Sequence, residues 1–304
     1  MSLIEKALEK MRAESAAAAG QPPPKPARPA AAAAPTALPG PAAAPRRVPR
    51  QTVEIDSDTL LAAGVLAPED KQHQQVSDYR HIKRQVMSLA ASASITVGAA
   101  SRVIMVTSAL PGEGKTFTAI NLALSLALER DSSVLLIDGD VAKPNTSRLL
   151  NIERYPGLLD ALADERAEVE DYVLGTNING LYALSAGKVT DTANEYLSSA
   201  RMATIMEQLL ADRNRYIVLD TPPLLVTTEA AALANHAGQV LMVVRADSTV
   251  QRAVLDALHL LGEREGINMV LNRVTHTRLE GYYYGYSYGD RYGDTPVPKA
   301  LSHI

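Results

Sequence analysis

The sequence lacks cysteine altogether, and its six histidines show no paired spacing of the kind that metal ligands have on a helix. Disulfides, thiolate nucleophiles and zinc–thiolate sites are therefore excluded. No set of Ser, His and Asp residues lies in the strand–turn–helix context of a nucleophile elbow. Neither zinc chemistry nor hydrolysis of the serine type is expected.

An excess of positive charge and long apolar runs are also missing. Lys plus Arg number 30 against 34 Asp plus Glu, and the formal charge of −4 offers no general attraction to nucleic acid. No run approaches the roughly 18 continuous apolar residues of a membrane span, and the first residues lack the apolar core of a signal peptide. We expect a cytoplasmic protein, unless a partner recruits it elsewhere, and one that binds no nucleic acid.

The first 69 residues differ in composition from the remainder. Ser2 and Glu5 have capping-box spacing in a possible amphipathic helix over residues 1–12, which is either a docking segment or a frayed terminus. Residues 13–50 contain 15 Ala and 10 Pro among 38 positions, a composition that buries little surface. We predict a disordered linker over 13–69.

From about Asp70 the pattern becomes that of a folded domain, which we predict to extend to Val274. A helix is expected through Tyr79, Ile82, Val86 and Leu89, and the stripe of Met202, Ile205, Met206 and Leu209 is expected in the core. Six short apolar runs follow the first helix: Arg102 to Thr107, Val134 to Ile137, Leu181 to Leu184, Tyr216 to Leu219, Val240 to Val244 and Met269 to Leu271. Helical segments between most of them predict a doubly wound α/β fold with a mostly parallel sheet.

A glycine-rich loop follows the first of these runs, and a helical stretch from Phe117 to Arg130 comes next. Its residues 109–116 match the phosphate-loop motif G-x-x-x-x-G-K-[ST], with Ala109 replacing the first glycine. Main-chain N–H groups would bind phosphate oxygens, Lys115 would reach the β and γ phosphates, and the Thr116 hydroxyl could ligate magnesium. The motif therefore predicts a nucleotide site.

Acidic residues end two further apolar runs. Asp138 and Asp140 follow Val134 to Ile137, and Asp220 follows Tyr216 to Leu219. In an open parallel sheet the carboxyl ends of the strands share one edge, so these carboxylates should lie beside the phosphate loop. An Asp at a strand end is also a common turn residue, but three such residues beside a phosphate loop favour a magnesium site.

The runs at residues 108–116, 135–144 and 217–223 resemble the Walker A, Walker A′ and Walker B motifs of bacterial tyrosine kinases, which have a P-loop ATPase fold of the MinD/ParA-like type. Shorter sequence motifs similar to those of the family extend the resemblance over most of residues 76–304. The opening residues, the Ala/Pro-rich segment and the run at 79–83 look most like the cytosolic autokinase of exosortase-associated exopolysaccharide loci.

The resemblance implies ATP and Mg²⁺ as cofactors. It implies magnesium binding by Thr116, Asp138 and Asp220, and catalytic roles for Lys115, Asp138 and Asp140, with Asp138 or Asp140 orienting or deprotonating the acceptor hydroxyl. The residues expected around the nucleotide are Ala109, Pro111, Gly112, Glu113, Gly114, Lys115, Thr116, Phe117 and Asn272.

Two positions depart from the family pattern. Ala142 stands where many members have Arg, followed here by Lys143. The oligomerisation motif, which usually reads Glu, two residues, Arg, two residues, Arg, is represented by Ser77, Arg80 and Lys83. Loss of the first carboxylate puts ring assembly in question more than ATP binding.

The chain ends in a segment rich in tyrosine and glycine, predicted to be a flexible tail over 275–304. Its clustered tyrosines are Tyr282, Tyr283, Tyr284, Tyr286, Tyr288 and Tyr292. By itself such a cluster could be an aromatic low-complexity segment. Beside a predicted ATP site it is interpreted as a set of phospho-acceptors, which the family also has.

The resulting hypothesis is an ATP-dependent protein-tyrosine autokinase that regulates bacterial exopolysaccharide biosynthesis or export. The resemblance implies a membrane polysaccharide chain-length (copolymerase) protein as activator, a cognate tyrosine phosphatase and self-association. The alternatives are a MinD/ParA-like ATPase dimerisation switch, whose signature lysine is replaced here by Leu110, and a non-catalytic nucleotide-binding scaffold.

Overall fold

The structure, a computed structural model, describes residues 49–93 and 98–274. The predicted N-terminal helix, most of the Ala/Pro-rich segment and the tyrosine-rich tail lie outside the described residues. No helix in the described part of the chain is both long enough and apolar enough to cross a bilayer.

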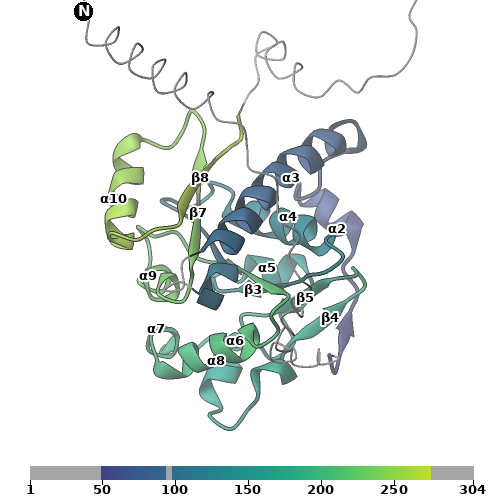
Figure 1. The fold of residues 1–304 in the computed structure, drawn as a ribbon, viewed down its shortest axis with the longest axis vertical. Coiled ribbons are helices and arrows are strands. Elements are labelled where there is room, and N and C mark those ends of the chain that lie inside the picture. The colour runs from purple at the N-terminus through teal and green to yellow at the C-terminus, as the bar shows by residue number, and fades with distance from the viewer. Residues whose placement is uncertain (1–48, 94–97, 275–304) are drawn as a thin grey trace, which may run out of the picture. The chain divides into compact units, whose positions relative to one another are not determined.

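An eight-stranded sheet runs through the described domain in the order β1-β4-β5-β3-β6-β2-β7-β8 (Figure 1). Its strands are β1 (Thr52–Val53), β2 (Val103–Ser108), β3 (Ser133–Asp138), β4 (Leu174–Thr176), β5 (Leu181–Leu184), β6 (Arg215–Asp220), β7 (Gln239–Arg245) and β8 (Ile267–Asn272). Neighbouring strands are parallel apart from the β4–β5 pair, which is antiparallel. The predicted mostly parallel sheet is thereby confirmed.

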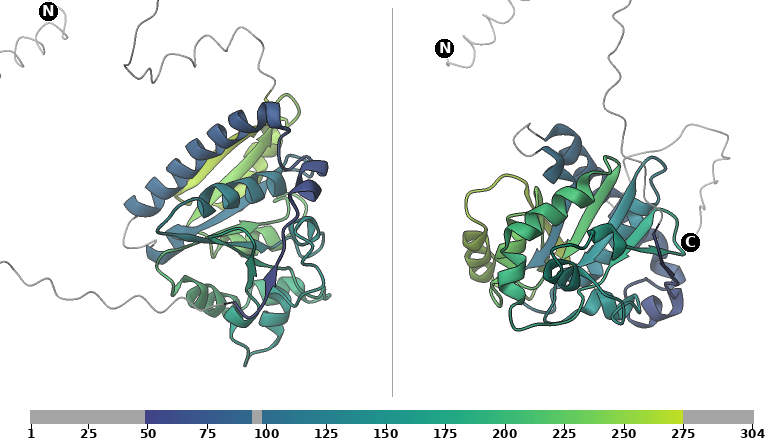
Figure 2. Two further views of the ribbon diagram at one scale, coloured as in Figure 1. Left: turned by 90° about the vertical axis from the view of Figure 1, so that its right-hand side faces the viewer. Right: turned by 90° about the horizontal axis from the view of Figure 1, so that it is seen from below.

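Helices cover both faces of this sheet (Figure 2). They are α2 (Ser57–Ala62), α3 (Glu69–Ser92), α4 (Lys115–Ala127), α5 (Asn145–Leu149), α6 (Leu158–Ala163), α7 (Ala193–Leu197), α8 (Ala200–Leu210), α9 (Glu229–Ala234) and α10 (Gln251–Leu261), with 3-10 turns at Gly98–Arg102 and Val169–Asp171. Side chains from α2, α3, α4 and α5 pack on one face, and those from α6 to α10 pack on the other.

Strand β2 shows why its run of apolar residues is continuous. Val103 and Met105 point into the core on the α8 side, whereas Ile104 and Val106 point into the core on the α4 side. All four side chains are fully buried. A strand buried on both faces needs no polar alternation, so the sequence pattern and the packing agree. The stripe that begins at Met202 is likewise buried, along α8.

The predicted linker differs from the structure at its C-terminal end. Strand β1 pairs with β4, and α2 begins after Asp56, whose carboxylate accepts hydrogen bonds from the first amides of that helix. Val53 and Leu60 are buried in the same core as α4. The Ala/Pro composition ends near residue 50, and a strand of two residues has no periodicity to detect, so extending the linker to residue 69 was wrong.

Strand β8 also departs from the expectation of strands covered on both faces. It is an edge strand, paired only with β7, and Met269 and Leu271 are 63% and 59% exposed. Their apolar character resembles that of the central strands, but no helix of the described domain covers them.

Candidate active site

The phosphate loop occupies residues 109–114, between the end of β2 and the start of α4. Gly112 and Gly114 have φ angles of 78° and 103°. Residues other than glycine rarely adopt such positive φ angles. A Cβ atom on Gly114 would also lie 2.0 Å from Nδ2 of Asn272. Gly114 is the N-cap of α4, and the unpaired N–H groups of a helix's first turn, with the positive end of its dipole, form an anion site. The loop therefore has the form of a phosphate cradle.

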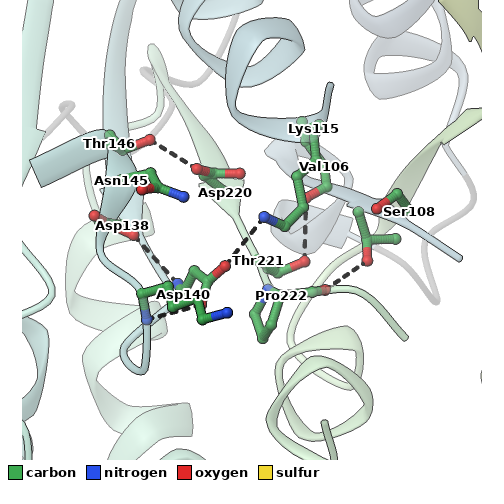
Figure 3. A network of polar contacts seen from close by, with 12 residues as sticks. Val106, Ser108, Lys115, Asp138, Asp140, Asn145, Thr146, Asp220, Thr221 and Pro222 are labelled. Atoms are coloured by element: carbon green, nitrogen blue, oxygen red, sulfur yellow. Dashed lines mark hydrogen bonds and ion pairs between the residues drawn. The ribbon is translucent and has the colours of Figure 1, made fainter. Parts of the chain in front are cut away.

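Lys115 is the first residue of α4, and its side chain extends toward the carboxyl end of β3 (Figure 3). Its Nζ lies 3.1 Å from Oδ2 of Asp140, and its side chain is only 12% exposed. The lysine predicted to contact the β and γ phosphates therefore forms an ion pair with one of the predicted carboxylates at the carboxyl end of the sheet.

Asp138 and Asp220 are direct partners across β3 and β6, at the carboxyl ends of both strands. Both are fully buried. Asp138 accepts hydrogen bonds from the main-chain N–H groups of Asp140 (3.2 Å) and Ser147 (2.6 Å). Oδ2 of Asp220 accepts one from the Thr146 hydroxyl (2.7 Å; Figure 3). The structure therefore brings all three predicted carboxylates together with Lys115.

Burial raises the pKa of both strand-end carboxyls above the ordinary aspartate range. For Asp138 the neighbouring Asp220 carboxylate adds to the effect, whereas for Asp220 the Lys115 ammonium opposes it. Two carboxylates removed from water hold their charges poorly unless a cation compensates them. This arrangement favours a cation or a proton at the pair.

The donor set fits a magnesium ion shared with a nucleotide. Oδ1 of Asp220 is buried and has no hydrogen-bond partner in the described structure. Thr116 is close enough to Asp220 for its hydroxyl to lower the carboxyl pKa. Within residues 49–93 and 98–274, no group of three or more His, Cys, Asp or Glu side chains could hold a metal by itself. Mg²⁺ commonly uses only one or two carboxylates and completes its octahedron with water and substrate phosphates.

The other residues expected around the nucleotide lie in or against the loop. Ala109 is fully buried, whereas Pro111 and Gly112 are exposed at the loop tip. Phe117 packs edge-on against Tyr79, with ring centroids 6.1 Å apart. Nδ2 of Asn272 donates to the Glu113 carbonyl at 2.9 Å. The tail tyrosines lie outside the described residues.

Sequence reasoning missed two residues that hold the carboxylates in place. Thr146 and Ser147, at the start of α5, donate to Asp220 and Asp138, and Oγ of Ser147 also accepts from the Ala186 N–H at 3.1 Å. The available signal was their position just after the run at 135–144. Polar residues next to a Pro are common in any turn, so position alone did not assign them.

The positions that depart from the family pattern are now located. Ala142 and Lys143 are both exposed, and the main-chain N–H of Lys143 donates to Oδ1 of Asp140 at 3.2 Å. Lys83 is 8% exposed, and its Nζ lies 2.5 Å from Oε1 of Glu129 on the same chain. Of the aligned oligomerisation positions, Lys83 is therefore engaged internally, and Arg80 is the exposed cation.

Comparisons with known proteins agree with this geometry. The sequence profile of the AAA domain family matches residues 101–263. Tyrosine-protein kinase Wzc of Salmonella typhimurium is 33% identical over 191 residues, which make up 61% of this chain and 26% of Wzc. Tyrosine-protein kinase YwqD of Bacillus subtilis is 33% identical over 158 residues, 52% of this chain and 65% of YwqD.

Among solved structures, the VpsO kinase domain matches with a TM-score of 0.52 and 32% identity, covering 65% of this chain and 100% of that domain. The chain itself spans less than two thirds of the length of Wzc, at 26%, and of YwqD, at 65%. The family match over residues 101–263 includes the phosphate loop and the acidic edge of the sheet.

Proposed function

The chain belongs to the AAA domain family and, within it, to the bacterial tyrosine-kinase domains, and from that premise we propose that it transfers the γ-phosphoryl group of ATP to tyrosine hydroxyls. One observation carries the proposal. A phosphate loop, its lysine and two buried carboxylates from separate strands converge at one edge of the sheet.

The loop amides and Lys115 bind the phosphates of ATP. Asp220, Asp138 and the Thr116 hydroxyl hold Mg²⁺, which when bound neutralises charge on the phosphate oxygens. The unpartnered buried oxygen of Asp220 supports this assignment, since a metal ion would satisfy it. Asn272 lines the same site against the loop.

The reaction forms one bond and breaks one. A tyrosine oxygen attacks the γ-phosphorus, the bond to the ADP oxygen breaks, and the phenolic proton leaves. A tyrosine hydroxyl has a pKa of about 10 in water, so a carboxylate that accepts its proton as transfer proceeds is useful. Asp138, whose pKa is raised by burial, or Asp140 beside Lys115 takes that role. Alignment and charge neutralisation supply most of the acceleration.

The acceptors are the tyrosines of the C-terminal segment, Tyr282 to Tyr292. Their proximity along the chain supports this, because Asn272 contacts the phosphate loop and the segment starts just beyond it. The eight residues from Val274 to Tyr282 span at most about 29 Å. This length allows a tyrosine of the same chain as the acceptor, and a tyrosine of a second copy is the alternative.

The biological setting follows from the same resemblance. The kinase regulates bacterial exopolysaccharide synthesis or export from the cytoplasmic side of the inner membrane. A membrane copolymerase protein activates it, a tyrosine phosphatase reverses it, and copies self-associate. The exosortase-associated subtype stays a prediction within this proposal.

Intact-mass analysis tests the function. The full chain is dephosphorylated by coexpression with a phosphatase and then incubated with Mg²⁺ and ATP. Wild type should gain multiples of 80 Da, while Lys115→Met should gain none, since the cation that contacts the phosphates is lost. Lys188→Met, at an exposed lysine outside the site, is the matched control.

A variant with all six clustered tyrosines changed to Phe shows where the label goes. Loss of the mass gain would assign the tail as acceptor, and retention would move the acceptor elsewhere. ATP hydrolysis without any mass gain would favour the dimerisation-switch alternative. Nucleotide binding without hydrolysis or transfer would favour the scaffold.

A further inference from the structure

Glu113 is a charged residue inside the phosphate loop, yet it is only 3% exposed. Its Oε2 accepts a hydrogen bond from the Leu110 N–H at 2.8 Å. Its Oε1 accepts one from the Thr249 hydroxyl, a short contact between residues 136 positions apart. A buried carboxylate is costly unless donors satisfy it, so these contacts decide where the Glu113 side chain lies.

Thr249 precedes α10 in the loop that follows β7. Its Oγ1 accepts a hydrogen bond from the Arg245 N–H at 3.2 Å, and its own N–H donates to the Arg245 carbonyl at 3.1 Å. With its oxygen already accepting from Arg245, the hydroxyl has its one proton directed to Glu113. Thr249 is thereby oriented by the end of β7 and in turn orients the phosphate loop.

The main chain of Glu113 is held from a second direction. Asn272, the last residue of β8, donates to its carbonyl oxygen. Glu113 is thus fixed by the carboxyl end of β8 through its backbone and by the β7–α10 loop through its side chain.

We propose that Glu113 and Thr249 form a latch that pre-sets the phosphate loop, with Thr249 as a positioning residue for nucleotide binding. The latch keeps a carboxylate of the same charge sign as the substrate turned away from the phosphate side of the loop. Without the Thr249 hydroxyl, one oxygen of that carboxylate loses its donor inside the protein. The side chain then rotates and releases the Leu110 N–H, so the phosphate loop is no longer held in its binding conformation.

This inference rests on the proposed function, because it assigns a role within the same nucleotide site. The test uses the full-length chain, Mg²⁺ and a fluorescent ATP analogue in equilibrium titrations, together with steady-state autophosphorylation. Thr249→Val removes the donor at nearly constant volume. Thr249→Ser restores it, and Thr204→Val repeats the substitution on the exposed face of α8.

We expect Thr249→Val to raise the Kd of the analogue about tenfold and to raise KM for ATP similarly, with kcat at saturation little changed. Thr249→Ser should return both to within about twofold of wild type, and Thr204→Val should match wild type. Because Glu113 and Thr249 take part in the same hydrogen bond, their effects on binding should not add. The double variant Glu113→Ala/Thr249→Val should have a Kd no higher than that of whichever single variant binds the analogue less tightly.

The outcomes separate the two proposals. If wild type binds the analogue and Thr249→Val binds equally well, the latch is refuted while the nucleotide site stands. Failure of Thr249→Ser to recover binding, or additive effects in the double variant, would also overturn the latch. Should Thr249→Val fail to fold by circular dichroism, the Kd of Glu113→Ala decides, since the latch requires the same rise. If wild type binds no nucleotide, both proposals fail.

Discussion

Replacing Asp220 with Asn should stabilise the folded protein while weakening its binding of Mg²⁺ and nucleotide. Burial raises the pKa of this carboxyl from 3.8 to about 6. Ionising it inside the fold is therefore unfavourable, and nothing in the described structure donates to its Oδ1. Asn keeps an acceptor for the Thr146 hydroxyl and removes the buried charge. Its loss also removes the repulsion between the Asp220 and Asp138 carboxylates.

The size of the effect follows from linkage. Each factor of ten in the proton-binding constant is worth about 1.4 kcal/mol. A carboxyl with a folded-state pKa of about 6 and an unfolded value of 3.8 thus costs on the order of 3 kcal/mol once fully ionised. In a folded domain of this size class, that corresponds to a rise in Tm of about 6 to 12 °C for Asp220→Asn.

The destabilisation caused by the ionised Asp220 carboxyl should depend on pH. Because the folded-state pKa lies above the unfolded one, the cost is complete above about pH 7, falls as the pH drops through 6, and vanishes below the unfolded value. The gain from Asp220→Asn should therefore be larger at pH 8 than at pH 5.

Thermal unfolding in EDTA, without nucleotide, measures this gain. Asp131→Asn, at an exposed carboxyl, is the control and should leave Tm unchanged at both pH values. Titration with Mg²⁺ and an ATP analogue should show weaker binding for Asp220→Asn. Equal Tm gains at pH 8 and pH 5, or no gain at either, would refute the assignment of Asp220 as an unfavourably buried carboxylate retained for its ligand.

Two further substitutions probe the loop and the core. Gly114→Ala should abolish analogue binding in titrations, since its Cβ would meet Asn272 and the φ of 103° adds strain of about 1–3 kcal/mol; unchanged affinity would contradict the loop geometry. Arg215→Ala should lower the free energy of unfolding by about 3–5 kcal/mol in urea, because Arg215 is 2% exposed and leaves its ion-pair partner Glu170 mostly buried. A loss below about 1 kcal/mol would mean that Glu170 is readily rehydrated.

The central strands and the phosphate loop could be predicted because their signals are local. Each apolar run became a strand within one or two residues of its expected ends, as with Val134 to Ile137 in β3. Helix α4 begins at Lys115, two residues before the expected start. Strand β4 has only three residues, one of which is Gly175, so it carried too little pattern to be recognised.

The carboxylates of the site were also predictable, but their surroundings were not. Parallel strands must end at one edge, so Asp138 and Asp220 could be placed together before any register was known. The donors at Thr146 and Ser147 depend on how α5 packs against that edge. A hydroxyl in a turn has many possible partners until packing selects one.

The amino-acid sequence by itself determined the α/β class, the phosphate loop and the acidic strand ends, because each depends on residues close together in the chain. The tertiary structure alone decided that Lys83 turns inward to Glu129 and that Thr249 meets Glu113. Such contacts join residues far apart in the chain. They form only when separate elements pack at fixed distances, and a list of residues contains no such distances.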